Sequence, residues 1–124
     1  MRLLYRSNNI MAEMTSKIVK LFCDNNGKEP FIEWLQNLDK VTKRIIENRI
    51  LRLSLGNYGD YKRINKDILE LRLYIGLGYR VYFAEDDGDI VILLCGGDKK
   101  SQKKDIEKAS IYYKTYKDNK NENI

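Results

Sequence analysis

The chain of 124 residues contains no histidine. This absence excludes a Ser-His-Asp triad, a Cys-His dyad and any zinc site built on histidine. It also removes the side chain that most often acts as a general base near neutral pH. Any catalysis must therefore depend on arginine, lysine, tyrosine and carboxylate groups.

Cysteine and long apolar runs are also scarce. The two cysteines, Cys23 and Cys95, are too few for a disulfide scaffold and lack the spacing of a zinc site, so we expect two reduced thiols packed as small hydrophobic groups. No apolar run approaches the roughly 18 residues of a membrane span. We therefore expect a cytoplasmic protein with no membrane partner, no metal site and no cofactor.

The composition that remains is typical of one globular domain. Hydrophobic residues make up 43% of the chain and charged residues 33%, which is enough apolar material for a single core. The 23 lysines and arginines exceed the 18 acidic residues, giving a net charge of +5. A moderately basic balance favours an anionic partner such as RNA, DNA or an acidic protein segment.

The first half of the chain predicts one strand followed by two helices. Residues 16–23 alternate loosely between apolar and polar and end at an Asp-Asn-Asn-Gly turn signal, which is typical of a strand. Pro30 can occupy the start of a helix whose apolar residues recur at helical spacing up to Leu38. Asp39 can cap a second helix, and Gly56 can end it. These two helices form an αα-hairpin.

The second half predicts three strands and a last helix. Residues 68–75, 79–84 and 90–95 are rich in β-branched and aromatic side chains and are separated by short glycine-containing turns, as in an antiparallel meander. The third run is almost wholly apolar, so it should be central and buried. Residues 101–116 have a helical pattern. The order β-αα-βββ-α indicates a two-layer α+β fold, with a small, mostly antiparallel sheet packed against the αα-hairpin.

Both ends of the chain are predicted to be poorly ordered. Residues 1–15 have too few apolar side chains for a secretory signal, and we expect a weakly ordered extension such as an upstream start codon would add. The alternative is a short helix packed on the domain. We expect the folded domain to span residues 16–116 and residues 117–124 to form a disordered tail.

Cations recur on either side of the predicted turns of the meander. Arg72 and Arg80 lie in successive strands, and a short turn at residues 76–78 would bring both guanidiniums to one face. The other cations expected near them are Lys62, Arg63, Lys99 and Lys100. Such a cluster suits a phosphodiester.

Aromatic side chains lie between these cations. The rings of Tyr74, Tyr79 and Tyr82 could stack on unpaired bases. The alternative is that the arginines form ordinary surface ion pairs with Glu70, Glu85 or Asp86.

Three segments, taken together, resemble the addiction-module killer proteins of the RelE/ParE toxin superfamily. They are GDYKRIN, ILELRLYIGLGYRVYF and IVILLCGGDKKSQKKDIEKA, and the similarity is greatest to the HigB-like, phage-derived subfamily. The resemblance runs from about Ser16 to Tyr116. It implies the RelE/ParE-like fold, a small sheet packed on an αα-hairpin.

The resemblance also implies a function. Such a protein is the toxin of a type II toxin–antitoxin system and inhibits translation as an mRNA endoribonuclease that acts on the ribosome without a metal ion. Its expected partners are the ribosome, mRNA and a co-encoded antitoxin of the helix-turn-helix type.

Roles carried over by motif fall on the basic residues. Arg72 of ELR and Arg80 of GYR match positions that engage the scissile phosphate, and Lys99 of GGDK matches another basic position that lines the site. We expect all three to be catalytic. The residues expected to bind RNA are Lys62, Arg63, Tyr82, Lys100 and Gln102.

The chain departs from the family pattern in its C-terminal segment. Ribosome-dependent members have a tyrosine or histidine there, whereas residues 103–106 of this chain read Lys-Lys-Asp-Ile. This departure keeps two alternatives open: a ParE-like gyrase poison that acts by binding protein, and a non-catalytic module that binds RNA or its antitoxin.

Overall fold

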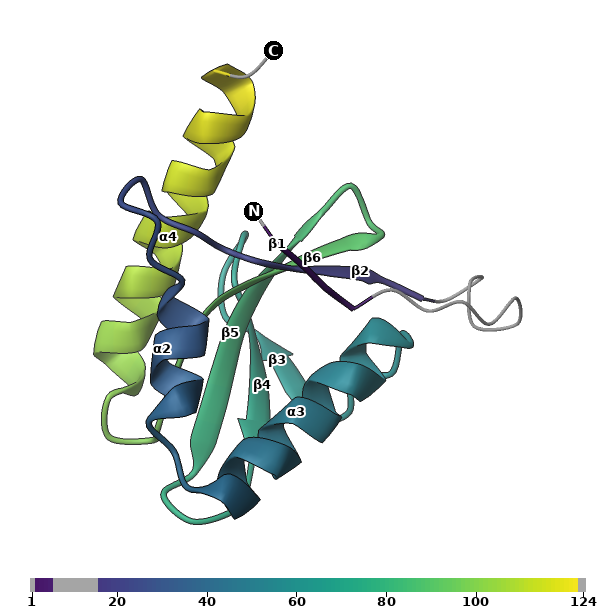
Figure 1. Ribbon diagram of the computed structural model, residues 1–124, viewed down its shortest axis with the longest axis vertical. Coiled ribbons are helices and arrows are strands. Elements are labelled where there is room, and N and C mark those ends of the chain that lie inside the picture. Colours follow the sequence, from purple (N-terminus) through teal and green to yellow (C-terminus); the bar gives the residue numbers. More distant parts are fainter. Residues whose placement is uncertain (1, 6–15, 123–124) are drawn as a thin grey trace.

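The computed structural model describes residues 2–5 and 16–122, and these residues form a six-stranded sheet with helices on both faces (Figure 1). The strand order is β1-β2-β6-β5-β4-β3. The strands are β1 (Arg2–Tyr5), β2 (Ile18–Leu21), β3 (Tyr61–Arg63), β4 (Leu69–Leu73), β5 (Tyr79–Asp86) and β6 (Ile90–Gly97), and the helices are α2 (Pro30–Gln36), α3 (Lys40–Ser54) and α4 (Gln102–Glu122). The predicted α+β class is confirmed.

The two faces of the sheet have separate hydrophobic cores. Helices α2 and α3 pack on one face, where Phe31 and Ile50 join apolar residues of β2, β4, β5 and β6. Helix α4 covers part of the other face, where Ala109 and Tyr113 pack with Tyr82. The molecule therefore has three layers where the sequence analysis expected two, because α4 crosses the face opposite the helix pair (Figure 1).

The meander of β4, β5 and β6 is antiparallel and forms the centre of the sheet. Strand β6 lies between β5 and β2 and pairs with β2 in parallel. This position explains its nearly continuous apolar sequence, since its residues are buried on both faces. The predicted central place of β6 is confirmed.

Two strands have no counterpart in the sequence analysis. Strand β1 pairs antiparallel with β2, so residues 2–5 have a partner where we expected a weakly ordered extension. The remainder of that extension, residues 6–15, lies outside the described residues. Strand β3 is a three-residue edge strand paired with β4, and all its residues are exposed. Neither strand shows an apolar alternation long enough to predict it; backbone pairing defines both.

Both ends of α3 carry the capping residues that the sequence predicts. Asp39 caps α3 by accepting a hydrogen bond from the Thr42 amide at 3.0 Å. Gly56 has a φ of +86° after the helix, the left-handed conformation that glycine adopts readily.

Helix α4 continues to Glu122, through most of the segment expected to be a disordered tail. Its last turns are held by contacts with distant residues: Lys120 Nζ lies 2.8 Å from a carboxylate oxygen of Asp86 at the end of β5, and Asn119 donates to the Asn25 side chain at 2.8 Å. These long-range contacts cannot be inferred from the polar composition of the segment. Residues 123–124 lie outside the described residues. Of the helices described, none is long and apolar enough to cross a membrane.

Candidate functional site

A fully buried carboxylate, Glu70, lies at the centre of the candidate site. Its Oε1 accepts a hydrogen bond from Arg72 Nε at 2.8 Å, and its Oε2 lies 3.5 Å from Arg80 Nε. Gln102, the first residue of α4, donates its side-chain amide to Oε2 at 2.9 Å. One carboxylate thus holds two guanidiniums.

The register of the meander produces this arrangement. Arg72 is directly opposite Arg80, and Glu70 is directly opposite Tyr82. Because side chains alternate between the faces of a sheet, these four residues share one face, the one on which α4 packs. The predicted proximity of Arg72 and Arg80 is confirmed.

The charge state of Glu70 follows from its neighbours. Burial raises the pKa of this carboxyl, but hydrogen bonds from Arg72 and Gln102, with the nearby Tyr82 hydroxyl and the Arg80 charge, hold the pKa below its usual value. The same contact with Glu70 raises the pKa of Arg72. Glu70 is therefore an ionised partner of the arginines. It is shielded from solvent and is not available to take a proton from a substrate.

Lys99 completes a group that we call the basic site, defined as Arg72, Arg80 and Lys99. The Lys99 amide donates to the Leu77 carbonyl at 3.3 Å, which ties the turn after β6 to the turn between β4 and β5. In that second turn, Arg80 Nη1 donates to the Gly78 carbonyl at 2.8 Å. A Cβ atom added at Gly78 would lie 3.4 Å from both Arg80 Nη1 and Lys99 Cβ, so these two side chains flank the same glycine.

Two of the predicted RNA-binding lysines border the basic site. Lys62 on β3 is in register with Glu70, so it lies on the same face, and it is exposed. Lys100 is exposed in the turn before α4, where its amide donates to Asp98 Oδ1 at 2.9 Å. Both lysines can extend the positive surface.

Three other predicted RNA-binding residues have different surroundings in the structure. Arg63 is in register with Leu69 on the opposite face and lies 3.5 Å from a Glu85 carboxylate oxygen. Tyr82 is fully buried and has no surface on which a base could stack. The Gln102 amide binds Glu70, so its contact is internal.

The arginines do form ion pairs with Glu70, as the alternative interpretation held. The pairs differ from ordinary surface ion pairs because the Glu70 side chain is 0% exposed and that of Arg80 is 11% exposed. Carboxylates in such positions are rare unless they are paired. The sequence signal for this burial was weak, because Glu70 alternates with apolar residues as a solvent-facing residue would.

Sequence analysis missed Arg49, a buried arginine of α3. It donates to the backbone carbonyls of Arg72 at 2.7 Å, Tyr58 at 3.1 Å and Asp60 at 2.5 Å. Arg49 therefore fixes the backbone beneath Arg72 and the loop before β3. The available signal was its spacing, since position 49 falls on the apolar stripe between Ile46 and Leu53.

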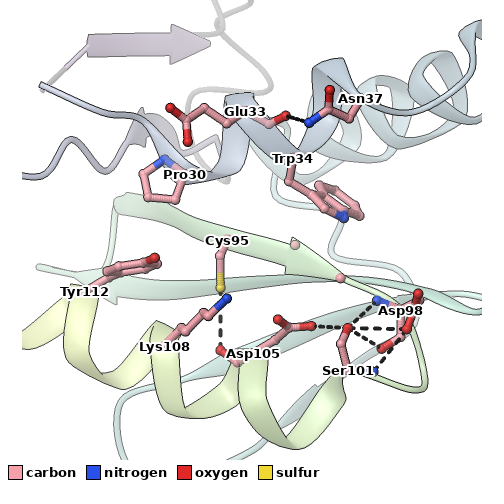
Figure 2. A pocket seen from close by; sticks show the side chains of 12 residues that line it. Pro30, Glu33, Trp34, Asn37, Cys95, Asp98, Ser101, Asp105, Lys108 and Tyr112 are labelled. Carbon is pink, nitrogen blue, oxygen red and sulfur yellow. Dashed lines mark hydrogen bonds between the residues drawn. The ribbon is translucent and has the colours of Figure 1, made fainter.

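A separate cavity of about 420 Å³ lies between α2 and α4, beside the end of β6 (Figure 2). Three carboxylates line it, those of Glu33, Asp98 and Asp105, together with Lys108. Asp105 accepts a hydrogen bond from the Ser101 hydroxyl at 2.5 Å. The acidic lining makes this cavity a poor place for a phosphate and distinguishes it from the basic site.

The two glycines of the GGDK segment have a packing role beside this cavity. A Cβ atom at Gly96 would overlap the Trp34 ring, and one at Gly97 would overlap the Asp105 carboxylate. Both positions therefore require glycine so that α2 and α4 can approach β6. Among the described residues, no group of three or more His, Cys, Asp or Glu side chains could hold a metal ion.

Comparison with known proteins places the chain in a family. The family model described as "Phage derived protein Gp49-like (DUF891)" matches residues 33–117, which is more than half of the chain. The chain is also 50% identical over 82 residues to an uncharacterized protein of Haemophilus influenzae, an alignment that covers 65% of this chain and 83% of that protein. The chain belongs to the Gp49-like family of phage-derived proteins.

Proposed function

We propose that this protein is the toxin of a type II toxin–antitoxin system, with a RelE/ParE-like, HigB-like fold, and that it cleaves mRNA on the ribosome in the cytoplasm. Membership of the phage-derived Gp49-like family supports a toxin-like module. The ELR, GYR and GGDK segments that resemble RelE/ParE toxins supply Arg72, Arg80 and Lys99 of the basic site.

The observation that carries this proposal is the pair of guanidiniums aligned by Glu70. The carboxylate accepts a hydrogen bond from Arg72 Nε and lies 3.5 Å from Arg80 Nε, while Arg80 Nη1 donates to the Gly78 carbonyl, so both side chains are held before a phosphate arrives. Donors fixed in place before reaction stabilise developing negative charge more than mobile donors do. Arginine also offers several N–H groups in a planar fork that matches phosphate oxygens.

The proposed reaction needs no metal ion. The ribose 2′-oxygen attacks the adjacent phosphorus, and the bond from phosphorus to the 5′-oxygen breaks. The products are a 2′,3′-cyclic phosphate and a 5′-hydroxyl. Negative charge gathers on the phosphoryl oxygens in the transition state, where Arg72, Arg80 and Lys99 stabilise it, each donor contributing about 3 kcal/mol.

Proton transfer is assigned to groups outside the basic site. Glu70 is ionised but buried and paired with both arginines, so it cannot reach the 2′-hydroxyl. In this proposal water or a ribosomal group accepts the 2′-hydroxyl proton, and water protonates the 5′-oxygen that leaves. The ribosome contributes by orienting the mRNA for in-line attack.

The same charges define the proposed regulatory partner. A co-encoded antitoxin, expected to be of the helix-turn-helix type, would silence the toxin by laying an acidic segment over the basic site. Exposed Lys99, Lys100 and Lys62 give that segment cations to approach. Association should then slow as salt screens the attraction.

The test is cleavage of a defined mRNA by the purified protein on translating ribosomes, mapped by primer extension. Arg80→Ala should reduce the cleavage rate roughly 100- to 1000-fold while the circular dichroism spectrum is retained. Arg63→Ala is the matched control because Arg63 lies on the opposite sheet face, and it should cleave at the parental rate. Cleavage that survives Arg80→Ala would refute the assignment, and trapping of gyrase on supercoiled DNA without mRNA cleavage would favour the gyrase alternative.

A further inference from the structure

Three tyrosines lie in or beside the strands that carry the basic site, and they differ in exposure. Tyr82 shares the face of the basic site but is 0% exposed. Tyr79 is in register with Leu73, on the opposite face, and its ring packs edge-on against Trp34 with the centroids 6.3 Å apart. Tyr74 is 75% exposed.

Tyr74 directly follows β4, and its neighbours Leu73 and Ile75 both pack in the core under α2 and α3, which leaves Tyr74 on the side of Glu70 and Arg72. Residues two apart in extended backbone are separated by about 7 Å, which brings the Tyr74 side chain within reach of the Arg72 guanidinium. Its hydroxyl lies close enough to Arg72 to help raise the pKa of that side chain, after the larger effect of Glu70. An exposed aromatic ring therefore lies beside a cation that is fixed in place.

We infer that Tyr74 is the stacking platform for the base next to the phosphate held by Arg72 and Arg80. The ligand it selects is single-stranded RNA, because only an unpaired base can leave its neighbours and stack on a protein ring. The inference rests on the proposed function, since it adds a nucleobase subsite to the same phosphate site. Tyr74 acts by positioning the nucleotide and takes no part in proton transfer.

The experiment uses the full-length protein and a short RNA with 2′-O-methyl riboses, which cannot be cleaved by 2′-oxygen attack. A 2-aminopurine base in the RNA reports stacking by loss of its fluorescence, and anisotropy reports affinity. Tyr74→Phe keeps the ring and should retain both signals. Tyr74→Leu should abolish the quenching and weaken binding roughly 5- to 150-fold, with an unchanged salt dependence because no phosphate contact is lost.

Tyr61→Leu is the matched control. Tyr61 is 49% exposed, but it is in register with Leu71 and so lies on the opposite face of the sheet. This variant should bind and quench as the parent does. The inference is overturned if Tyr74→Leu binds and quenches within twofold of the parent, or if the parent does not quench at all.

The ribosome assay separates this inference from the proposed function. Cleavage that depends on Arg80 but quenching that does not depend on Tyr74 would leave the nuclease proposal standing and refute the stacking platform. Quenching that depends on Tyr74 without any mRNA cleavage would support the platform and refute the nuclease.

Discussion

Replacing Glu70 by glutamine removes a negative charge from a fully buried position that two guanidiniums share. The glutamine carbonyl can still accept from Arg72, but an NH2 group replaces the oxygen that accepts from Gln102 and lies beside Arg80. Removing one partner of a buried ion pair typically costs about 3–5 kcal/mol. The Arg72 side chain is 25% exposed and can turn toward water, so we expect a loss near the lower end of that range.

The assay is urea unfolding of the parent and of Glu70→Gln, followed by circular dichroism across a range of pH. The pKa of Glu70 is held below its ordinary value of 4.5 in the folded protein, so its ion pairs stabilise the fold fully above that pH. The stabilisation is lost as the pH falls through the lower, folded-state pKa. The difference between parent and variant should therefore be constant near neutral pH and shrink below about pH 4.5.

Glu85→Gln is the control for this prediction. Glu85 also lies beside an arginine and accepts from Tyr58, but its side chain is 28% exposed and its Arg63 partner 54% exposed. The same substitution there should cost no more than about 1 kcal/mol. Equal effects at the two glutamates, or a Glu70→Gln loss that does not change with pH, would refute the ion-pair reasoning.

Three further perturbations test other parts of the fold. Arg49→Met leaves three backbone carbonyls without their buried donor, so urea unfolding should show a free energy of unfolding lower by about 2–4 kcal/mol. The control is Arg52→Met at an exposed position, which should change that free energy by less than about 0.5 kcal/mol. Gly96→Ala forces a Cβ into the Trp34 ring and should cost about 1–3 kcal/mol, and an unchanged melting temperature would show that α2 can move freely. A chain that begins at Met14 lacks β1 and uncovers the edge of β2, so it should self-associate in size-exclusion chromatography; a stable monomer would show that β1 is dispensable.

Most of the fold could be predicted from local patterns. The αα-hairpin followed from apolar spacing and the Asp39 cap, and the meander followed from three β-rich runs with short turns. Strands β1 and β3 could not be predicted, because their definition comes from pairing with distant residues. The position of α4 was not predicted for a related reason. The apolar groups that α4 covers lie on the second face of the sheet, and no helix was expected to pack on that face.

The cations of the candidate site could be predicted from the sequence, but the buried residues that hold them could not. The short turn after β4 was enough to place Arg72 beside Arg80, and the motif order was enough to add Lys99. The burial of Glu70 was not predictable, because one of its hydrogen-bond partners, Gln102, comes from α4, whose position was not predicted. Arg49 was missed because a single charged residue on an apolar stripe does not reveal which carbonyls it will bind.

The balance of charge around Glu70 argues that the arginines serve more than the fold. One guanidinium would neutralise one buried carboxylate, and an apolar substitute for the whole group would often be no less stable. Instead Glu70 pairs with both Arg72 and Arg80, and Lys99 flanks the same turn glycine as Arg80, which leaves these four side chains with a net positive charge. Excess charge of one sign destabilises a compact state through self-repulsion, so folding alone gives no reason to gather it. Binding of an anionic ligand removes that repulsion. The place for such a ligand is the basic site, on the sheet face next to the first turn of α4.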